Sequence, residues 1–238
     1  MLLLRSTVFN LCFMLSTALF STLLMITRIF GFRAAWFWAK AWSASTYWLL
    51  NILCRIKLRV EGREHLPDKP CVVMAKHQSA AETIAMPILV PPYVWILKRE
   101  LYYIPFFGWA LAVMGTIAIR RGNPREAIKQ VIEQGKLFLD KQRWVVIFPE
   151  GTRSAPGTTG NYQPGGIVVA HKAGVGILPM ATNAGICWPK NGFLKHPGTI
   201  RVRFLPFIDA ETVAATKRSD LLAQLEKDIE AATRELGG

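Results

Sequence analysis

An uncharged run of 22 residues near the start of the chain, residues 6–27 between Arg5 and Arg28, most constrains the fold. As a helix, this run would be roughly 33 Å long, which matches the hydrocarbon thickness of a bilayer. It is too long for the apolar core of a usual signal peptide, and no small-x-small cleavage site follows it. These features favour a membrane helix. They leave open whether the helix spans the bilayer or only embeds in it.

A second apolar segment, residues 29–54, carries Arg33 and Lys40 together with aromatic side chains of the kind that settle at headgroup depth. It therefore predicts an interfacial helix rather than an independent span. The first 63 residues hold eight basic side chains against Glu61 alone, and most of them follow the first run. This excess predicts that the following domain lies on the cytoplasmic side of the cytoplasmic membrane. We therefore expect residues 1–57 to form a membrane anchor.

The overall composition excludes a disordered chain, because 51% of the residues are hydrophobic and only 19% are charged. The formal net charge of +13 predicts an anionic partner, such as a membrane surface, a phosphorylated substrate, an acidic carrier or nucleic acid. The four cysteines are widely spaced and form no C-x-x-C pair, so the sequence implies neither a zinc site nor a disulfide framework.

Residues 58–238 alternate short β-rich runs with helical patterns, which predicts one α/β domain with a mixed sheet flanked by helices. The expected strands cover residues 71–75, 94–97, 116–119, 145–148, 177–182 and 200–207. The expected helices cover residues 80–87, a segment that begins near residue 124, and residues 219–236.

Polar side chains follow three of these strands directly, in segments 77–79, 120–121 and 150–153. Ligands bind at the carboxyl ends of the strands in α/β sheets, so we expect one site there. His77 and Glu82 would diverge by about 140° on a regular helix. They can meet if His77 lies in the turn before the helix, and the carboxylate would then leave one imidazole nitrogen free as a general base.

Four blocks of the sequence together resemble the glycerolipid acyltransferases, and among them the 1-acylglycerol-3-phosphate acyltransferases. Residues 77–82 resemble the family's His-x4-Asp block, and residues 98–121 resemble its second block, with Arg121 on the arginine. Residues 148–153 match the Phe-Pro-Glu-Gly-Thr-Arg block throughout, and residues 175–179 resemble the proline-containing fourth block. The resemblance covers roughly residues 58–210.

The resemblance implies transfer of a fatty acyl group from acyl-CoA or an acyl-carrier protein to the free hydroxyl of a lysophospholipid. The most expected acceptor is 1-acylglycerol-3-phosphate, which would give phosphatidic acid. The resemblance assigns His77 as general base and Glu82 as the residue that orients it. It assigns substrate binding to Arg121, Glu150, Gly151, Thr152, Arg153 and Lys98. Lys98 could instead be an ordinary surface lysine.

Because a thioester is already activated, the reaction needs a base, an oxyanion donor and a phosphate clamp, but no metal and no cofactor beyond the thioester co-substrate. The expected partners are therefore the two substrates, the lipid bilayer and, as one of the two donors, an acyl-carrier protein. Nucleic acid is not expected, because the chain has no basic helix stripe and no stacking-aromatic motif.

The chain departs from the family pattern in three places. Glu82 replaces the usual Asp, Arg120 stands where many members carry Asp, and residues 162–166 lack the lysines often found there. Other functions stay open as well: transfer to another lysolipid, a hydrolase with Cys71 as nucleophile, or a membrane-tethered protein that binds anionic lipid. The preferred acyl chain, the donor, the acceptor and the oligomeric state are not encoded in any recognisable pattern.

Overall fold

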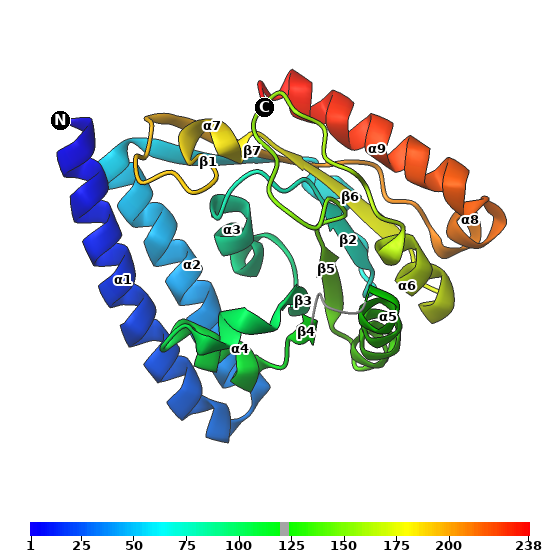
Figure 1. Ribbon diagram of the computed structural model, residues 1–238. Coiled ribbons are helices and arrows are strands. Elements are labelled where there is room, and N and C mark those ends of the chain that lie inside the picture. Colours follow the sequence, from blue (N-terminus) through cyan, green and yellow to red (C-terminus); the bar gives the residue numbers. More distant parts are fainter. Residues whose placement is uncertain (120–123) are drawn as a thin grey trace.

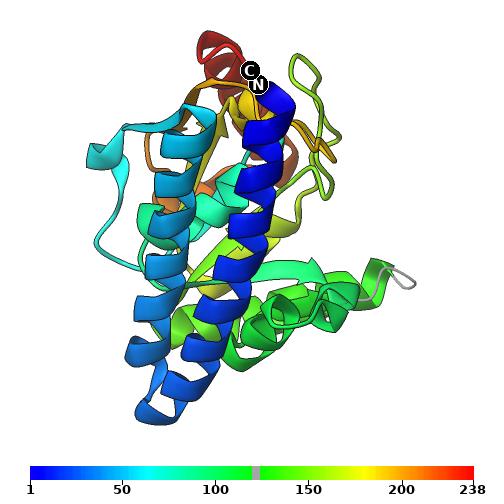
Figure 2. The same cartoon turned by 90° about the vertical axis from the view of Figure 1, so that its left-hand side faces the viewer.

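The computed structural model of the protein describes residues 1–119 and 124–238. It begins with two long helices, α1 (Leu2–Thr27) and α2 (Phe32–Cys54), joined by a single 3₁₀ turn, η1 (Arg28–Phe30). Gly31 completes this connection with a φ of 107°, a conformation that favours glycine. The two helices run side by side along one flank of the molecule (Figures 1 and 2). The expected apolar helix over residues 6–27 is therefore present, and it begins four residues earlier.

The rest of the chain is built on a seven-stranded sheet with the order β1-β7-β6-β2-β5-β3-β4. Its strands are β1 (Ile56–Glu61), β2 (Val72–Ala75), β3 (Tyr93–Lys98), β4 (Ile117–Ile119), β5 (Trp144–Ile147), β6 (Ile177–Thr182) and β7 (Gly198–Phe204). Strands β6, β2, β5, β3 and β4 are mutually parallel, whereas β7 is antiparallel to β6 and parallel to β1. The predicted mixed sheet is confirmed.

Helices cover both faces of this sheet (Figure 1). One face carries α1, α2, α3 (Ala81–Leu89) and α4 (Phe107–Met114). The other carries α5 (Pro124–Asp140), α6 (Gly165–Ala173), α8 (Ala210–Ala215) and α9 (Arg218–Glu235), while the short α7 (Ala184–Cys187) lies at one end. Two 3₁₀ turns, η2 (Arg63–His65) and η3 (Arg99–Tyr103), complete the elements.

The central strand β2 shows how the sequence builds a core on both faces. Cys71, Val73 and Ala75 pack in the cluster that includes α2 and α3, whereas Val72 and Met74 pack in the cluster of the opposite face. Successive side chains of a strand point to opposite faces, so an unbroken apolar run gives a strand that is buried on both sides. The same alternation continues into the turn that follows and decides where Lys76 and His77 point.

Several elements differ from the sequence-based expectation: the short helices α4, α6, α7 and α8 were not expected, and β1 and α3 differ for identifiable reasons. Strand β1 was not expected, because Lys57 and Arg59 alternate with its apolar residues and look like part of the basic flank of a membrane helix. Charged outward side chains are typical of an edge strand, which is where β1 lies. The expected end of α3 at Pro87 was wrong by two residues, since Pro87 lies inside the helix.

Candidate active site

His77 lies in the turn between β2 and α3, and Glu82 lies in the first turn of α3. The His77 Nδ1 atom is 2.8 Å from the Oε1 atom of Glu82, whose side chain is fully buried. The reach-back arrangement that the sequence suggested is therefore the arrangement in the structure. The extra methylene of Glu82, relative to Asp, is accommodated within the first helical turn.

The same Glu82 oxygen also accepts hydrogen bonds from two backbone N–H groups of the turn, those of Gln78 at 2.9 Å and Ser79 at 2.7 Å. Carboxylates are stabilised at helix N-termini, where free N–H groups and the helix dipole favour negative charge. Glu82 thus holds the imidazole and the turn in one orientation. Within the described part of the chain, His77 Nε2 has no hydrogen-bond partner, and the side chain is 15% exposed.

The segment after β5 wraps around His77. The Phe148 ring stacks on the imidazole with a centroid distance of 3.9 Å and an interplanar angle of 16°. The Ser154 N–H donates to the His77 carbonyl oxygen at 2.8 Å. Between these residues, Gly151 has a φ of 64°, which a side chain would strain. The first and third sequence blocks therefore form one site at the carboxyl edge of the sheet, as expected.

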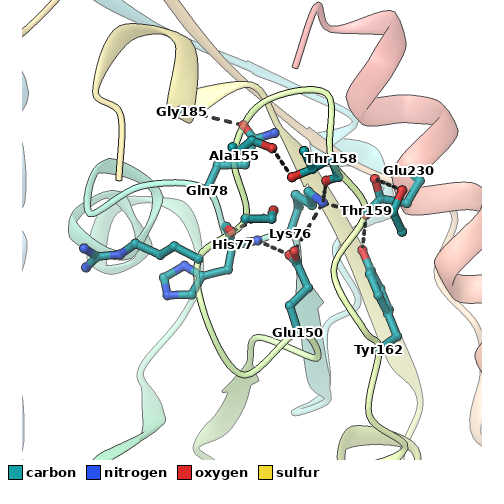
Figure 3. A network of polar contacts seen from close by, with 12 residues as sticks. Lys76, His77, Gln78, Glu150, Ala155, Thr158, Thr159, Tyr162, Gly185 and Glu230 are labelled. Atoms are coloured by element: carbon teal, nitrogen blue, oxygen red, sulfur yellow. Dashed lines mark hydrogen bonds and ion pairs between the residues drawn. The ribbon is translucent and has the colours of Figure 1, made fainter. Parts of the chain in front are cut away.

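Glu150 points into the protein (Figure 3). Its Oε1 atom accepts the His77 backbone N–H at 2.7 Å, and its Oε2 atom accepts from the Lys76 ammonium at 3.2 Å. Its side chain has no exposed surface. In this placement, the carboxylate can influence a bound phosphate only through His77 and the turn that both residues shape.

The remaining predicted members of this turn face outward. Gly151 and Thr152 are exposed, and Arg153 is half-buried. The Lys190 ammonium donates to the Arg153 carbonyl oxygen at 2.7 Å, which brings a second cation to this turn. The outer side of the turn is therefore positively charged and accessible, as a site for an anionic substrate requires.

The other two predicted binding residues are less closely tied to His77. Lys98 is exposed at the end of β3, which is separated from β2 by β5 alone. It therefore lies at the same edge of the sheet as His77. Arg121, like its neighbour Arg120, lies outside the described residues.

Sequence reasoning missed Lys76 and Lys190. Lys190 carries no recognisable signal, since it lies in a loop outside the four blocks. Lys76 did carry one, because a lysine directly after an apolar strand that is buried on both faces will be buried unless the chain turns outward. It is fully buried, and its ammonium contacts two carboxylates.

The geometry disfavours Cys71 as a nucleophile. Its side chain is fully buried in the core, and burial raises the pKa of the thiol well above its usual range. A thiolate nucleophile requires the opposite environment. Within residues 1–119 and 124–238, no cluster of three or more histidine, cysteine or acidic side chains is arranged to hold a metal ion.

An apolar cavity that is open to solvent lies between the helical hairpin, α4 and the first half of β3. Its lining includes Leu24, Trp36, Trp95, Phe107, Ala110 and Met114. Aromatic and aliphatic walls of this kind are typical of sites that bind apolar ligands.

Comparisons with known proteins show the family of this chain. Residues 57–183 match the protein family described as Acyltransferase. The chain is 44% identical to a 1-acyl-sn-glycerol-3-phosphate acyltransferase of Pseudomonas aeruginosa, over 87% of this chain and 81% of that protein. It is 30% identical to an enzyme of the same name from Borreliella burgdorferi, over 74% of this chain and 72% of that protein.

The fold also matches a solved structure, that of the 1-acyl-sn-glycerophosphate acyltransferase of Thermotoga maritima, with a TM-score of 0.81. This match covers 98% of the present chain and 96% of the other at 21% sequence identity, so it shows the fold alone. The family match and the identity to the curated enzymes show more: the chain is an enzyme and belongs to the acyltransferase family, together with these 1-acyl-sn-glycerol-3-phosphate acyltransferases.

Proposed function

We propose that this enzyme transfers a fatty acyl group from an acyl thioester to the free hydroxyl of 1-acylglycerol-3-phosphate, giving phosphatidic acid. The observation that carries the proposal is the His77–Glu82 pair beside the basic outer side of the turn at Arg153. The names of the enzymes that share up to 44% of its sequence support the same acceptor.

In the proposed mechanism, His77 Nε2 takes the proton of the acceptor hydroxyl as that oxygen attacks the thioester carbonyl carbon. The buried Glu82 carboxylate fixes the tautomer through Nδ1 and stabilises the imidazolium that forms. When the tetrahedral intermediate collapses, the C–S bond breaks and the thiolate leaves with the proton from Nε2. The products are the new ester and the free thiol, with no acyl-enzyme and no cofactor beyond the thioester.

Arg153 is proposed to hold the acceptor phosphate, because a planar guanidinium can bind two phosphate oxygens at once. Thr152 and the Gly151 backbone lie on the same outer side of the turn. Arg121 and Lys98 remain proposed contributors to this phosphate site or to the donor route. Glu150 is proposed to support the turn that presents Arg153.

The apolar cavity is proposed to receive an acyl chain, since its walls are aromatic and aliphatic. A thioester donor brings such a chain whether its thiol belongs to coenzyme A or to an acyl-carrier protein. Narrowing the cavity with Ala110→Phe should therefore shift the preference of either donor toward shorter chains.

The membrane helix is proposed to embed in one leaflet, with the catalytic domain on the cytoplasmic side. Helix α1 is, among the described residues, the one helix long and apolar enough to span a bilayer. It is fastened to the domain near both ends, however: the Ser6 hydroxyl accepts from the Lys195 N–H at 2.9 Å, and Leu24 is buried in one cluster with Ala110 and Met114 of α4. A helix that packs on the domain along its length cannot also cross the membrane beside it.

The outward face of α1 carries exposed apolar side chains suited to the bilayer: Leu3, Leu4, Val8, Leu11, Met14, Leu15, Leu19 and Ile26. Replacing Leu11, Leu15 and Leu19 together with serine should weaken binding to phospholipid vesicles without unfolding the domain. Unchanged vesicle binding would argue against this membrane-facing surface.

The proposed reaction is tested with purified, detergent-solubilised protein and a matrix of acyl-CoA and acyl-carrier-protein donors against several lysolipids. Phosphatidic acid and free thiol should appear in equal amounts with at least one donor, and His77→Ala should abolish both. Lipid binding without thioester consumption would favour the anionic-lipid-binding alternative. A trapped acyl-enzyme would favour the hydrolase alternative.

A further inference from the structure

A buried ion network lies behind His77, on the opposite face of the sheet from the imidazole (Figure 3). We name it the Lys76 network; it consists of Lys76, Glu150, Thr159, Tyr162 and Glu230. Of these five residues, only Glu150 belongs to the mechanism proposed above. The network joins helix α9, near the end of the chain, to the turn that carries His77.

Lys76 is the centre of the network, and its ammonium uses all three of its donors. It contacts Glu150 Oε2 at 3.2 Å, Glu230 Oε1 at 2.7 Å and the Thr158 carbonyl oxygen at 3.0 Å. Its side chain has no exposed surface. Lys76 and His77 are adjacent, so they point to opposite faces of the sheet, and a displacement of one moves the backbone of the other.

Glu150 passes this constraint to His77 directly. While Oε2 is held by Lys76, Oε1 accepts the His77 backbone N–H at 2.7 Å. The backbone of the base is therefore fixed by one buried carboxylate, and its ring by another, Glu82.

Glu230 and Tyr162 complete the charge balance. Two carboxylates surround one ammonium, and the second negative charge is met by the Tyr162 hydroxyl, which donates to Glu230 Oε1 at 3.0 Å, and by the Thr159 hydroxyl at 3.4 Å. Burial and the nearby Glu230 raise the pKa of Tyr162, so the phenol remains a neutral donor. Removing one member of such a cluster leaves a buried charge without its partner.

We infer that Lys76, Glu230 and Tyr162 are positioning residues for the reaction, which act on the base through Glu150. A well-packed apolar core would hold α9 in place without three buried ionisable groups. What the ions add is a directional constraint on one backbone amide, that of His77. Misplacing a reacting group by about 1 Å can cost on the order of 100-fold in rate.

The test uses three variants at increasing proximity to His77, together with a matched control, in the full chain. Tyr162→Phe, Glu230→Gln and Lys76→Met should lower kcat by roughly threefold, tenfold and 100-fold in that order. The KM values for donor and acceptor should not change, because these side chains lie behind the site. The control is Glu235→Gln, which removes an exposed carboxylate of the same helix that pairs with Arg203 at 2.6 Å, and it should behave like the parent.

A second measurement does not depend on activity. With ¹⁵N-labelled histidine, the four histidines give four backbone amide signals, and His77→Gln identifies the one to follow. Glu230→Gln and Lys76→Met should shift this signal and speed its hydrogen exchange, whereas Glu235→Gln should not. If Lys76→Met fails to fold, the Glu230→Gln and Tyr162→Phe variants test the positioning role instead.

The kcat measurement rests on the proposed function, whereas the measurement of the His77 amide signal does not. An inactive parent with the expected amide shifts would contradict the proposed function and keep the network. Folded variants with an unmoved His77 amide, or with lower thermal stability but an unchanged kcat, would overturn the positioning role. So would a raised acceptor KM at an unchanged kcat.

Discussion

Two buried carboxylates, those of Glu82 and Glu150, hold His77, and they differ in the groups that they bind. Glu82 uses one oxygen to hold the imidazole and two N–H groups of the turn, and its other oxygen is buried without a partner among the described residues. Glu150 engages both oxygens, one with the His77 N–H and one with the Lys76 ammonium. Glu82 contacts the imidazole ring that is proposed to transfer the proton, and Glu150 contacts the backbone of the same residue.

The difference indicates how the two roles are divided. The hydrogen-bond partners of Glu82 are the His77 ring and two backbone N–H groups, none of which is a permanent cation. Its negative charge is therefore available to stabilise the imidazole when that ring becomes positive. The charge of Glu150 is already matched by Lys76, and its contribution is geometric. Both side chains have no exposed surface, so burial alone would not distinguish them.

The largest effect is expected at Glu82. Glu82→Gln keeps the size but removes the charge that stabilises the imidazolium, and kcat should fall by roughly 10²–10⁴, the usual contribution of a general base. Glu82→Asp restores the charge with a shorter reach and should lie between Gln and the parent. The measurement is kcat at saturating donor and acceptor. A Gln variant within a few-fold of the parent would reduce Glu82 to a helix-start residue.

A substitution of Arg153 tests whether the outer side of this turn binds the acceptor phosphate. Glu150 lies on the inner side of the same turn. Arg153→Lys keeps the charge but loses the planar contact with two phosphate oxygens. The acceptor KM should rise by an amount equivalent to about 1–3 kcal/mol, while the donor KM stays unchanged. A raised donor KM with an unchanged acceptor KM would move Arg153 to the thioester site.

Gly160 offers a way to disturb Glu150 without changing any charge. A Cβ at this position would lie 2.5 Å from Glu150 Oε2 and 2.8 Å from its Cγ, so Gly160→Ala should displace the carboxylate. We expect a cost of about 1–3 kcal/mol in unfolding free energy and a roughly tenfold lower kcat. Gly165→Ala is the matched control, because an added Cβ there would have no neighbour within 4 Å beyond the adjacent residues and the backbone of its own helix. Equal behaviour of both variants would show that Glu150 need not be held tightly.

Much of this site could be predicted from the sequence, and the missing part has a physical explanation. The strand after Cys71 and the helix after Ala80 place His77 and Glu82 within reach of each other from local pattern alone. The partner of Lys76 could not be predicted, because Glu230 is 154 residues away and lies on a helix whose apolar face was recognised but whose register on the sheet was not. Strand β1 was missed because an edge strand with alternating basic residues resembles a membrane flank.

The smallest effect is expected for Lys195, and it concerns the pH dependence of the unfolding free energy. Lys195 and Lys76 are both buried lysines, but their partners differ. The Lys195 ammonium donates to the Gly192 and Phe193 carbonyl oxygens and lies 4.5 Å from the Trp188 ring centroid. Burial lowers its pKa to about 8, against a small opposing effect of Cys54. Lys76, in contrast, has two carboxylate partners.

The lowered pKa of Lys195 sets the sign of its pH dependence. Between pH 8 and the ordinary lysine value of 10.5, the unfolded chain binds more protons than the folded one, so this residue makes the unfolding free energy rise with pH. Lys195→Met should flatten that rise in chemical denaturation series from pH 7.5 to 10. An equal slope in both proteins would show that Lys195 does not carry the dependence.

The most direct test of the central claim, that Glu82 acts through His77, is a double-mutant cycle on kcat. His77→Ala, Glu82→Gln and the double variant are compared with the parent at saturating substrates. If the two residues act as one unit, His77→Ala is at least as damaging as Glu82→Gln, and the double variant is little worse than His77→Ala alone. Losses that multiply in the double variant would show that the two residues act independently, which contradicts the mechanism proposed for this enzyme.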